Sequence, residues 1–283
     1  MTVVVTGATG HLGALVVRSL LDRGVAASDI VATGRRQDVL FLLSELGVRT
    51  AVADFDRPET LGPAFAGADT VLLISASEVG KRLAQHRAAI AAAVAAGVTD
   101  IVYTSIANAD TGGLALAAEH VATEGLLAAS GLRVTLLRNG WYIENHTDQI
   151  AGQAEYGVIG AAADGRFSSA TRADYAEAAA AVLADPELRG RTYELGGDTS
   201  YTLAEYAAWV GEATGRDVQY TDLGVDGLTA ALESAGVPTP FAQILADSDA
   251  GAARGALEVT GHELAELIGR PTTSPQSAIA AAL

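Results

Sequence analysis

Three glycines near the start of the chain, Gly7, Gly10 and Gly13, constrain the fold more than any other feature of the sequence. They follow an apolar segment typical of a β-strand, Val3–Thr6, and precede a stretch with helical periodicity. In that context the first glycine permits a sharp turn, the second lets backbone approach a pyrophosphate, and the third lets the helix lie close to the sheet. The alternative is a turn whose glycines are only structural, and the strand–turn–helix context argues against it. The motif predicts a dinucleotide site that contacts Gly7, Ala8, Thr9, Gly10, His11 and Leu12.

Short apolar segments alternate with helical ones through the first half of the chain. The expected strands are Val3–Thr6, Ile30–Thr33, Arg49–Ala53, Thr70–Ser75, Ile101–Thr104 and Arg133–Leu137. The expected helices between them lie near Leu12–Arg23, Gln37–Leu46, Pro58–Phe65, Val79–Ala96 and Ala115–Ala129. Strands that are apolar throughout and separated by helices indicate a parallel sheet covered on both faces. The sequence therefore predicts an α/β fold with a doubly wound parallel sheet of the Rossmann type.

The pattern changes after Leu137. Residues 140–157 are aromatic and polar, Ala173–Ala184 is helical, Thr192–Leu195 is a candidate for one further strand, and the chain from Thr202 onward is mostly helical. We expect residues 1–138, with about 158–195, to form the Rossmann domain. Residues 139–157 and 196–283 are expected to form a smaller, mostly helical domain over the carboxyl ends of the strands.

The end of the second expected strand indicates which dinucleotide is bound. An NAD site normally carries Asp or Glu there, whereas this strand ends in Thr33-Gly34-Arg35-Arg36. A guanidinium suits a 2′-phosphate by charge and by geometry, and Arg35 is nearest the strand end. The alternative is a solvated helix start, which is unfavourable because cations at a helix N-terminus oppose its dipole. NADPH is the expected cofactor.

Two further segments are candidates for cofactor contacts. Asp54 closes the third strand, where its carboxylate would accept from the adenine amino group, whereas Asp56 is the better candidate for a helix cap before Pro58. Ser75, Ala76 and Ser77 end the fourth strand with small residues, as a backbone passing close to a ribose requires. An ordinary serine turn is an equally good interpretation of that segment.

Composition excludes several classes of partner. The formal net charge is −16, which repels phosphate backbones and makes a nucleic-acid partner unexpected. The chain has no cysteine, and His86, His146 and His262 show no spacing of a metal site, so no metal is expected. The longest apolar run is too short to cross a bilayer and the chain opens on a strand, so we expect a cytoplasmic protein without a membrane partner. A homodimer is an open expectation.

Five segments together resemble the NmrA-like atypical short-chain dehydrogenases/reductases. They are Gly7–Gly13, Ile74–Gly80, Leu136–Tyr142, Ala170–Tyr175 and Leu245–Asp249, so the resemblance covers nearly the whole chain. The glycine motif is shared by many reductases, whereas Arg138-Asn139-Gly140-Trp141-Tyr142 is much more particular. The resemblance implies an NADPH-binding Rossmann domain, a small C-terminal domain and the reduction of quinones to hydroquinones.

The usual acid of short-chain reductases is missing from this sequence. Their Tyr-x-x-x-Lys would fall on Leu116 and His120, and Lys81 is the only lysine of the chain. Ketone reduction and sugar epimerisation therefore lose their proton donor. Quinone reduction tolerates this loss, because hydride transfer yields an aromatic hydroquinone anion that water can protonate later. The main contribution of the protein would then be proximity.

Several residues are candidates for contact with a small quinone. His120 is a candidate proton donor or an ordinary helix-surface histidine, and Ser105 is a candidate catalytic group or a simple cap. Tyr142 is a third catalytic candidate, and with Trp141 it would either stack on a flat acceptor or pack in the core. Arg172 is expected to reach a cofactor phosphate or the substrate. The expected substrate contacts are Asn139, Gly140, Trp141, Tyr142, Ile143 and Glu144.

Two other functions remain open from the sequence. A non-catalytic NADP(H) sensor that binds a protein partner is compatible with the missing acid. A reductase of carbon–carbon double bonds is less favoured, because the relatives that catalyse this reaction rely on a lysine near the position of His120.

Overall fold

Seven parallel strands form the central sheet of the computed structural model, which describes residues 1–283. The strand order is β3-β2-β1-β4-β5-β6-β9, and every neighbouring pair is parallel. The strands are β1 (Val3–Val5), β2 (Ile30–Gly34), β3 (Arg49–Val52), β4 (Thr70–Leu73), β5 (Asp100–Ile106), β6 (Arg133–Asn139) and β9 (Thr192–Leu195). The predicted doubly wound sheet is confirmed, including its last strand. The order reverses between β1 and β4, which is where such sheets bind ligands.

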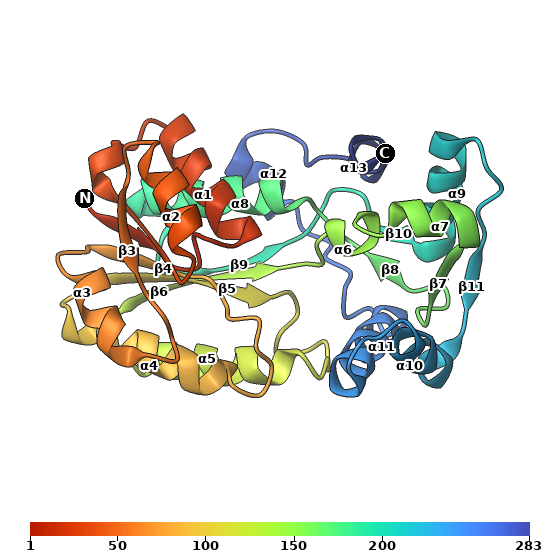
Figure 1. Ribbon diagram of the computed structural model, residues 1–283, viewed down its shortest axis with the longest axis horizontal. Helices are drawn as coiled ribbons and strands as arrows, with labels where there is room; N and C mark the ends of the chain where they lie inside the picture. The colour runs from red at the N-terminus through yellow and green to blue at the C-terminus, as the bar shows by residue number, and fades with distance from the viewer.

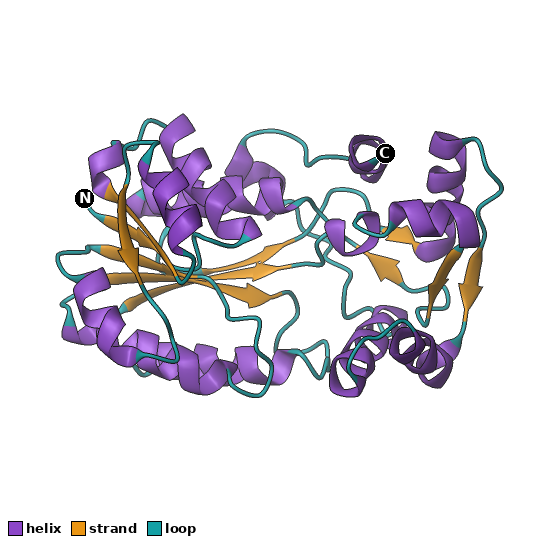
Figure 2. Cartoon of the chain, viewed as in Figure 1, coloured by secondary structure: helices purple, strands orange, loops and turns teal.

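Helices cover both faces of this sheet (Figures 1 and 2). One face carries α1 (His11–Asp22), α2 (Gln37–Ser44), α8 (Arg172–Ala184) and α12 (Glu263–Ile268), which share a core of 25 buried residues with the strands. The other face carries α3 (Leu61–Phe65), α4 (Arg82–Ala95) and α5 (Ala117–Ala128), with a core of 16. Short 3-10 turns lie at η1 (Ala27–Asp29), η2 (Pro58–Thr60) and η3 (Pro186–Leu188). Alanine makes α8 thin, so its backbone lies close to that of α1.

A second group of elements lies beyond the carboxyl ends of the strands (Figure 1). It contains α6 (Glu144–Thr147), α7 (Ile150–Tyr156), α9 (Leu203–Thr214), α10 (Gly224–Ser234), α11 (Thr239–Ala253) and α13 (Pro275–Ala282). Two small sheets join β7 (Val158–Gly160) to β11 (Tyr220–Asp222) and β8 (Arg166–Phe167) to β10 (Tyr201–Thr202). A separate core of 20 buried residues holds most of this group together.

The sequence missed the four short strands of this group. Each has two or three residues, which is too short for an alternating pattern to show. A segment near the C-terminus also returns to the large sheet. Its helix α12 packs on α8, and Leu264 of α12 joins the core between these helices and the sheet. The assignment of residues to two domains stays a prediction. None of the helices combines the length and apolar character that crossing a membrane requires.

Substitution of Gly13 tests how closely α1 must approach the sheet. A Cβ at Gly13 would lie 2.4 Å from the Gly7 carbonyl oxygen and 2.7 Å from the Ala8 Cα, both of them backbone atoms. Gly13→Ala is therefore expected to lower the free energy of unfolding by about 1–3 kcal/mol in denaturant titration. The control is Gly125→Ala in α5, where a Cβ meets nothing within 4 Å, and which is expected to stabilise by about 0.5–1 kcal/mol. Equal effects of the two substitutions would contradict this packing.

Asp249 on α11 gives a prediction about pH. Its Oδ2 accepts the Ala161 N–H at 3.0 Å, and burial raises the pKa of this carboxyl from 3.8 to about 6. The folded chain keeps the proton to a higher pH than the unfolded chain, so stability falls as pH rises through this interval and stays lower above it. Asp249→Asn is expected to raise the free energy of unfolding by about 1–3 kcal/mol at pH 7 and much less at pH 4. An equal effect at both pH values would show that the carboxyl ionises normally.

Candidate functional site

A cavity of about 430 Å³ lies at the carboxyl ends of β1, β2, β3 and β4. Ten of the predicted cofactor contacts line it: Gly7, Thr9, Gly10, His11, Leu12, Arg35, Asp54, Ser75, Ala76 and Ser77. Ala8 is fully buried, and its N–H donates to the Thr33 carbonyl at 2.8 Å, so it shapes the turn without lining the cavity. Arg172 lies elsewhere, with the residues that follow β6. The structure thus brings one coherent group of predicted residues together.

The glycine turn leaves the start of α1 open toward this cavity. Gly7 has φ of +61°, a conformation that other residues adopt with strain. No side chain caps α1, and its first turn contains no acidic residue. Free N–H groups and the positive end of the helix dipole therefore face the cavity, which favours an anion such as a diphosphate.

Arg35 lies directly beside this turn because β2 packs tightly on it. A Cβ at Gly34 would come within 2.4 Å of the Thr9 hydroxyl, so only glycine permits this contact. The Arg35 side chain is 60% exposed, and its Nη1 donates to Glu78 Oε1 at 3.2 Å. Arg36 instead pairs with Asp38. Of the two arginines, Arg35 is therefore the one whose side chain is joined to the loop after β4, through Glu78.

The wall at the end of β3 contains one predicted residue and two that sequence reasoning missed. Asp54 accepts the Asp56 N–H through Oδ1 at 3.1 Å, and its own N–H donates to the Thr60 hydroxyl. Asp56 does not cap the following turn, η2, whose cap position is Arg57. Phe55 and Gln85 complete the wall. Gln85 gives no sequence signal, because it lies within an alanine-rich helix and reaches the cavity only through the packing of α4.

His120 lies between α5 and β5 and does not line the cavity. Its Nδ1 is 2.8 Å from the Tyr103 hydroxyl, and the ring is only 5% exposed. Burial, together with the smaller effect of the nearby Arg82 charge, lowers the pKa of His120 to about 3. The ring is therefore neutral at physiological pH. The catalytic role of His120 stays a prediction, and this environment gives the side chain a clear part in packing.

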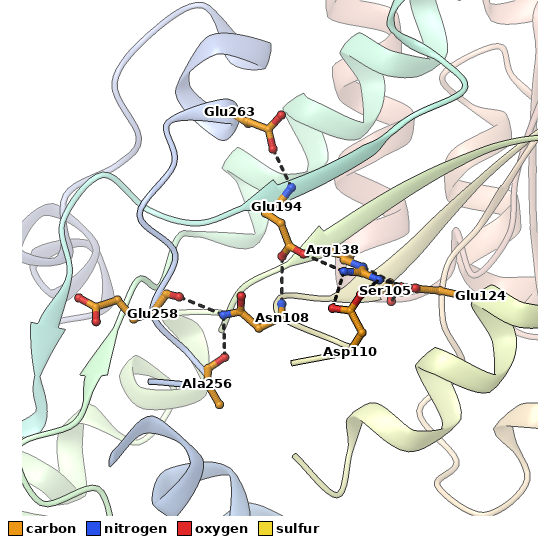
Figure 3. A network of polar contacts seen from close by, with 9 residues as sticks. All are labelled: Ser105, Asn108, Asp110, Glu124, Arg138, Glu194, Ala256, Glu258 and Glu263. Atoms are coloured by element: carbon orange, nitrogen blue, oxygen red, sulfur yellow. Dashed lines mark hydrogen bonds and ion pairs between the residues drawn. The ribbon is translucent and has the colours of Figure 1, made fainter. Parts of the chain in front are cut away.

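Ser105 belongs to a network of polar contacts around Arg138 (Figure 3). Its hydroxyl donates to Glu124 at 2.6 Å. Arg138 is nearly buried and binds three carboxylates, those of Glu124, Asp110 and Glu194, at 2.7 to 3.0 Å. These contacts raise the pKa of Arg138 above its ordinary value, with the Glu124 hydrogen bond as the largest cause. The predicted catalytic role of Ser105 stays open, and its observed partner is this network.

Asn108 connects the same network to the late part of the chain. Its N–H donates to Glu194, and its side-chain amide donates to the carbonyls of Ala256 and Glu258. The backbone of Asn108 has φ of +52°, which asparagine tolerates better than most residues. The ends of β5, β6 and β9 are thereby tied to the segment between α11 and α12.

The residues after β6 form a second group with Arg172. The Arg172 guanidinium lies 5.4 Å from the centre of the Tyr142 ring. The backbone N–H of Arg172 donates to Glu144 Oε1 at 2.8 Å. Tyr142 also packs edge-on against Tyr175, at 5.3 Å between ring centres. Burial raises the pKa of the Tyr142 hydroxyl, so it stays protonated.

Other predicted substrate contacts lie around this pair. Asn139 and Ile143 are buried, and Trp141 is half-buried against the core of the second group of elements. A Cβ at Gly140 would meet the Tyr175 hydroxyl at 2.9 Å, so Gly140 allows a close contact. Two buried oxygens here, Asn139 Oδ1 and Glu144 Oε2, have no protein hydrogen-bond partner. These two acceptors are therefore unpaired within the protein, and contact of the group with a substrate stays a prediction.

The sheet with its glycine turn and the cavity at the switch point define a dinucleotide-binding protein of the Rossmann class. The chain belongs to the NmrA-like family, whose model matches residues 1–253. The predicted resemblance is thereby confirmed.

Known relatives extend this result. The chain is 47% identical over 273 residues to quinone oxidoreductase 2 of Escherichia coli (strain K12), covering 96% of this chain and 95% of that protein. The motifs Ile74–Gly80 and Leu136–Tyr142 predict a particular likeness to bacterial type-2 NAD(P)H:quinone oxidoreductases, and this comparison confirms it.

Two solved structures share the fold over essentially the full chain. The crystal structure of the E. coli NADPH-dependent quinone oxidoreductase QOR2 complexed with NADPH matches with a TM-score of 0.96 at 45% identity, covering 99% of both chains. Triphenylmethane reductase of Citrobacter sp. complexed with NADP(H) matches with a TM-score of 0.94 at 33% identity, covering 100% of both chains.

Three histidines with strongly lowered pKa values predict how stability depends on pH. Burial lowers the pKa of His86 and His120 from 6.5 to about 3, and that of His146 to about 4. Below pH 6.5 the unfolded chain binds protons on these rings while the folded chain does not, so the free energy of unfolding falls as pH falls. Each ring contributes about 1.4 kcal/mol per pH unit.

His120→Asn is expected to make this decline shallower between pH 6 and pH 5, by about 1 kcal/mol per pH unit, in denaturant titrations at each pH. The matched control is His11→Asn, which makes the same replacement at an exposed histidine. If His120→Asn keeps the original slope, the ring is protonated in the folded protein and available to donate.

Proposed function

We propose that this protein is an NADPH-dependent oxidoreductase that transfers hydride to quinones. The observation that carries the proposal is a single cavity lined both by the uncapped start of α1 and by Arg35. The two are brought together by the contact of Gly34 with Thr9, which leaves no room for a Cβ at Gly34. The likeness to quinone oxidoreductase 2 over nearly the whole chain supports it. That likeness also favours an enzyme over the NADP(H)-sensing alternative.

The residues of the cavity suit NADPH in three places. The first turn of α1 would hold the diphosphate through its N–H groups. Arg35 would bind the 2′-phosphate, for which it must exchange Glu78 for a doubly charged partner. Asp54 would accept from the adenine amino group. When bound, the reduced nicotinamide supplies the hydride.

The protein's own contribution is orientation of the acceptor. Leu116 and His120 stand where related reductases carry Tyr and Lys, and His120 is buried and neutral. The chain therefore lacks the acid that a ketone needs, whereas a quinone accepts hydride without one and takes its proton from water. We propose that Tyr142, held by Arg172 and Tyr175, contacts the flat acceptor together with Asn139. Holding the two reactants in contact accounts for the rate.

The proposed partners follow from the same features. The acceptor is a small quinone, and the charge of −16 argues against nucleic acid. Action in the cytoplasm and a homodimer remain part of the proposal.

Turnover tests the proposed reaction. Purified protein mixed with NADPH and a simple benzoquinone is expected to consume NADPH and form the hydroquinone. If the protein binds NADPH and reduces no member of a broad quinone panel, the proposed reaction is wrong and the NADP(H)-sensing alternative is favoured.

Arg35 tests the choice of cofactor. Arg35→Ala is expected to weaken NADPH binding about 10- to 100-fold by calorimetry, because charged hydrogen bonds to the 2′-phosphate are lost, and to change NADH binding little. Arg57→Ala removes the same charge from an exposed pair with Glu59 outside the cavity and is the control. Equal loss of NADPH and NADH affinity in Arg35→Ala would show that Arg35 does not bind the 2′-phosphate.

A further inference from the structure

Ala76 lies in the cavity wall, and side chains of α4 bind both its backbone N–H and its carbonyl. The Ala76 N–H donates to His86 Nε2 at 3.0 Å, and the Ala76 carbonyl accepts from Arg82 Nε at 2.6 Å. His86 is fully buried and Arg82 is 5% exposed. Neither His86 nor Arg82 lines the cavity, and the sequence singled out neither for a role there.

The hydrogen bonds behind His86 have a fixed direction. The Thr123 hydroxyl on α5 donates its one proton to the Glu119 carbonyl at 2.7 Å. It must therefore accept from His86 Nδ1, which lies 2.9 Å away. His86 is then neutral with its proton on Nδ1, and Nε2 presents the lone pair that the Ala76 N–H needs. Burial, which lowers the pKa of His86 to about 3, keeps it so.

Arg82 is an unusual group to find beneath a loop. Its guanidinium is buried without a carboxylate partner, and its Nη1 donates to nothing in the protein. Buried charges without a partner destabilise a fold, so this one is a cost to stability. Burial lowers the pKa of Arg82, with the guanidinium still charged at neutral pH. A buried group that destabilises the fold in this way is characteristic of functional sites.

The loop itself is held by two more side chains. The Ile74 N–H donates to the Thr6 hydroxyl and the Ser75 N–H to the Thr104 hydroxyl, at 3.0 and 2.9 Å. Consecutive N–H groups at positions 74, 75 and 76 thus bind to side chains from the residue after β1, from β5 and from α4. None of these N–H groups remains for a ligand, so this stretch serves as a fixed wall.

Sheet order shows which half of a dinucleotide meets that wall. The diphosphate site lies at β1, with β2 on one side of it and β4 on the other. Arg35 follows β2, so the 2′-phosphate and its adenosine lie on that side. The nicotinamide half must then extend over the end of β4, where Ser75, Ala76 and Ser77 lie.

We propose that Arg82, His86 and Thr123 are positioning residues that hold Ser75–Ser77 in the shape required by the nicotinamide half of the cofactor. The inference rests on the proposed binding of NADPH. It assigns to three residues of α4 and α5 an action through the loop backbone, with no direct contact to the cofactor.

Affinity for the whole cofactor and for its adenosine half separates this role from simple stabilisation. The variants are His86→Leu, which removes the acceptor, and Thr123→Val, which removes the group that fixes the His86 tautomer. Thr123→Ser, which keeps the hydroxyl, is the matched control. Calorimetry measures the binding of NADPH and of adenosine 2′,5′-bisphosphate, and hydrogen exchange follows the peptide that contains Ala76.

We expect His86→Leu and Thr123→Val to weaken NADPH about tenfold while adenosine 2′,5′-bisphosphate binding stays within about twofold. Exchange at Ala76 rises in both variants, and Thr123→Ser behaves as the unaltered protein. If His86→Leu does not fold, the Thr123 pair decides alone. Equal losses for both ligands, or no loss of NADPH affinity in Thr123→Val, would overturn the inference. Failure of the proposed NADPH binding is distinct, because the unaltered protein would then bind neither ligand, and failure of the proposed reaction would appear as NADPH binding without quinone turnover.

Discussion

The close approach of α1 to the edge of the sheet is the constraint on which the rest of the structure depends. It requires Gly13 to lie against the carbonyl of Gly7 and Gly34 to lie against the side chain of Thr9. Neither position has room for a Cβ. Because the helix start is held this close, its free N–H groups face the cavity and Arg35 is placed within reach of the same ligand. The dinucleotide site therefore arises from backbone packing first and from charge second.

Two polar systems flank this site on the β4 and β5 side, and they differ in chemistry. Below the loop after β4, a buried and uncharged pair, Thr123 and His86, holds the Ala76 N–H, and the Arg82 guanidinium holds the Ala76 carbonyl. At the ends of β5 and β6, Arg138 binds three carboxylates and leaves a net negative cluster. The first system fixes a wall of the cavity, and the second joins strand ends to the late chain. Both systems place hydrogen bonds and ion pairs of defined geometry around the region in which the cofactor and a flat acceptor would be held together.

The sequence predicted those parts of the molecule that local pattern controls. The seven strands follow from apolar runs, the glycine turn from its spacing, and the position of Arg35 in the cavity wall from its place after Gly34. The four strands of the small sheets escaped prediction because two or three residues carry no periodicity. The Arg138 network could not be foreseen, because its partners come from positions as far apart as Asp110 and Glu194. Gln85 and His86 lie in an alanine-rich helix, and only the packing of α4 gives each of them a different task.

A structure of the protein with NADPH bound tests the central claim most directly. The account predicts the diphosphate against the first turn of α1, the 2′-phosphate on Arg35 in place of Glu78, and the nicotinamide over Ser75–Ser77, facing Tyr142. A dinucleotide bound in the opposite direction, with its nicotinamide beside Arg35, or bound outside the glycine-lined cavity, would contradict it.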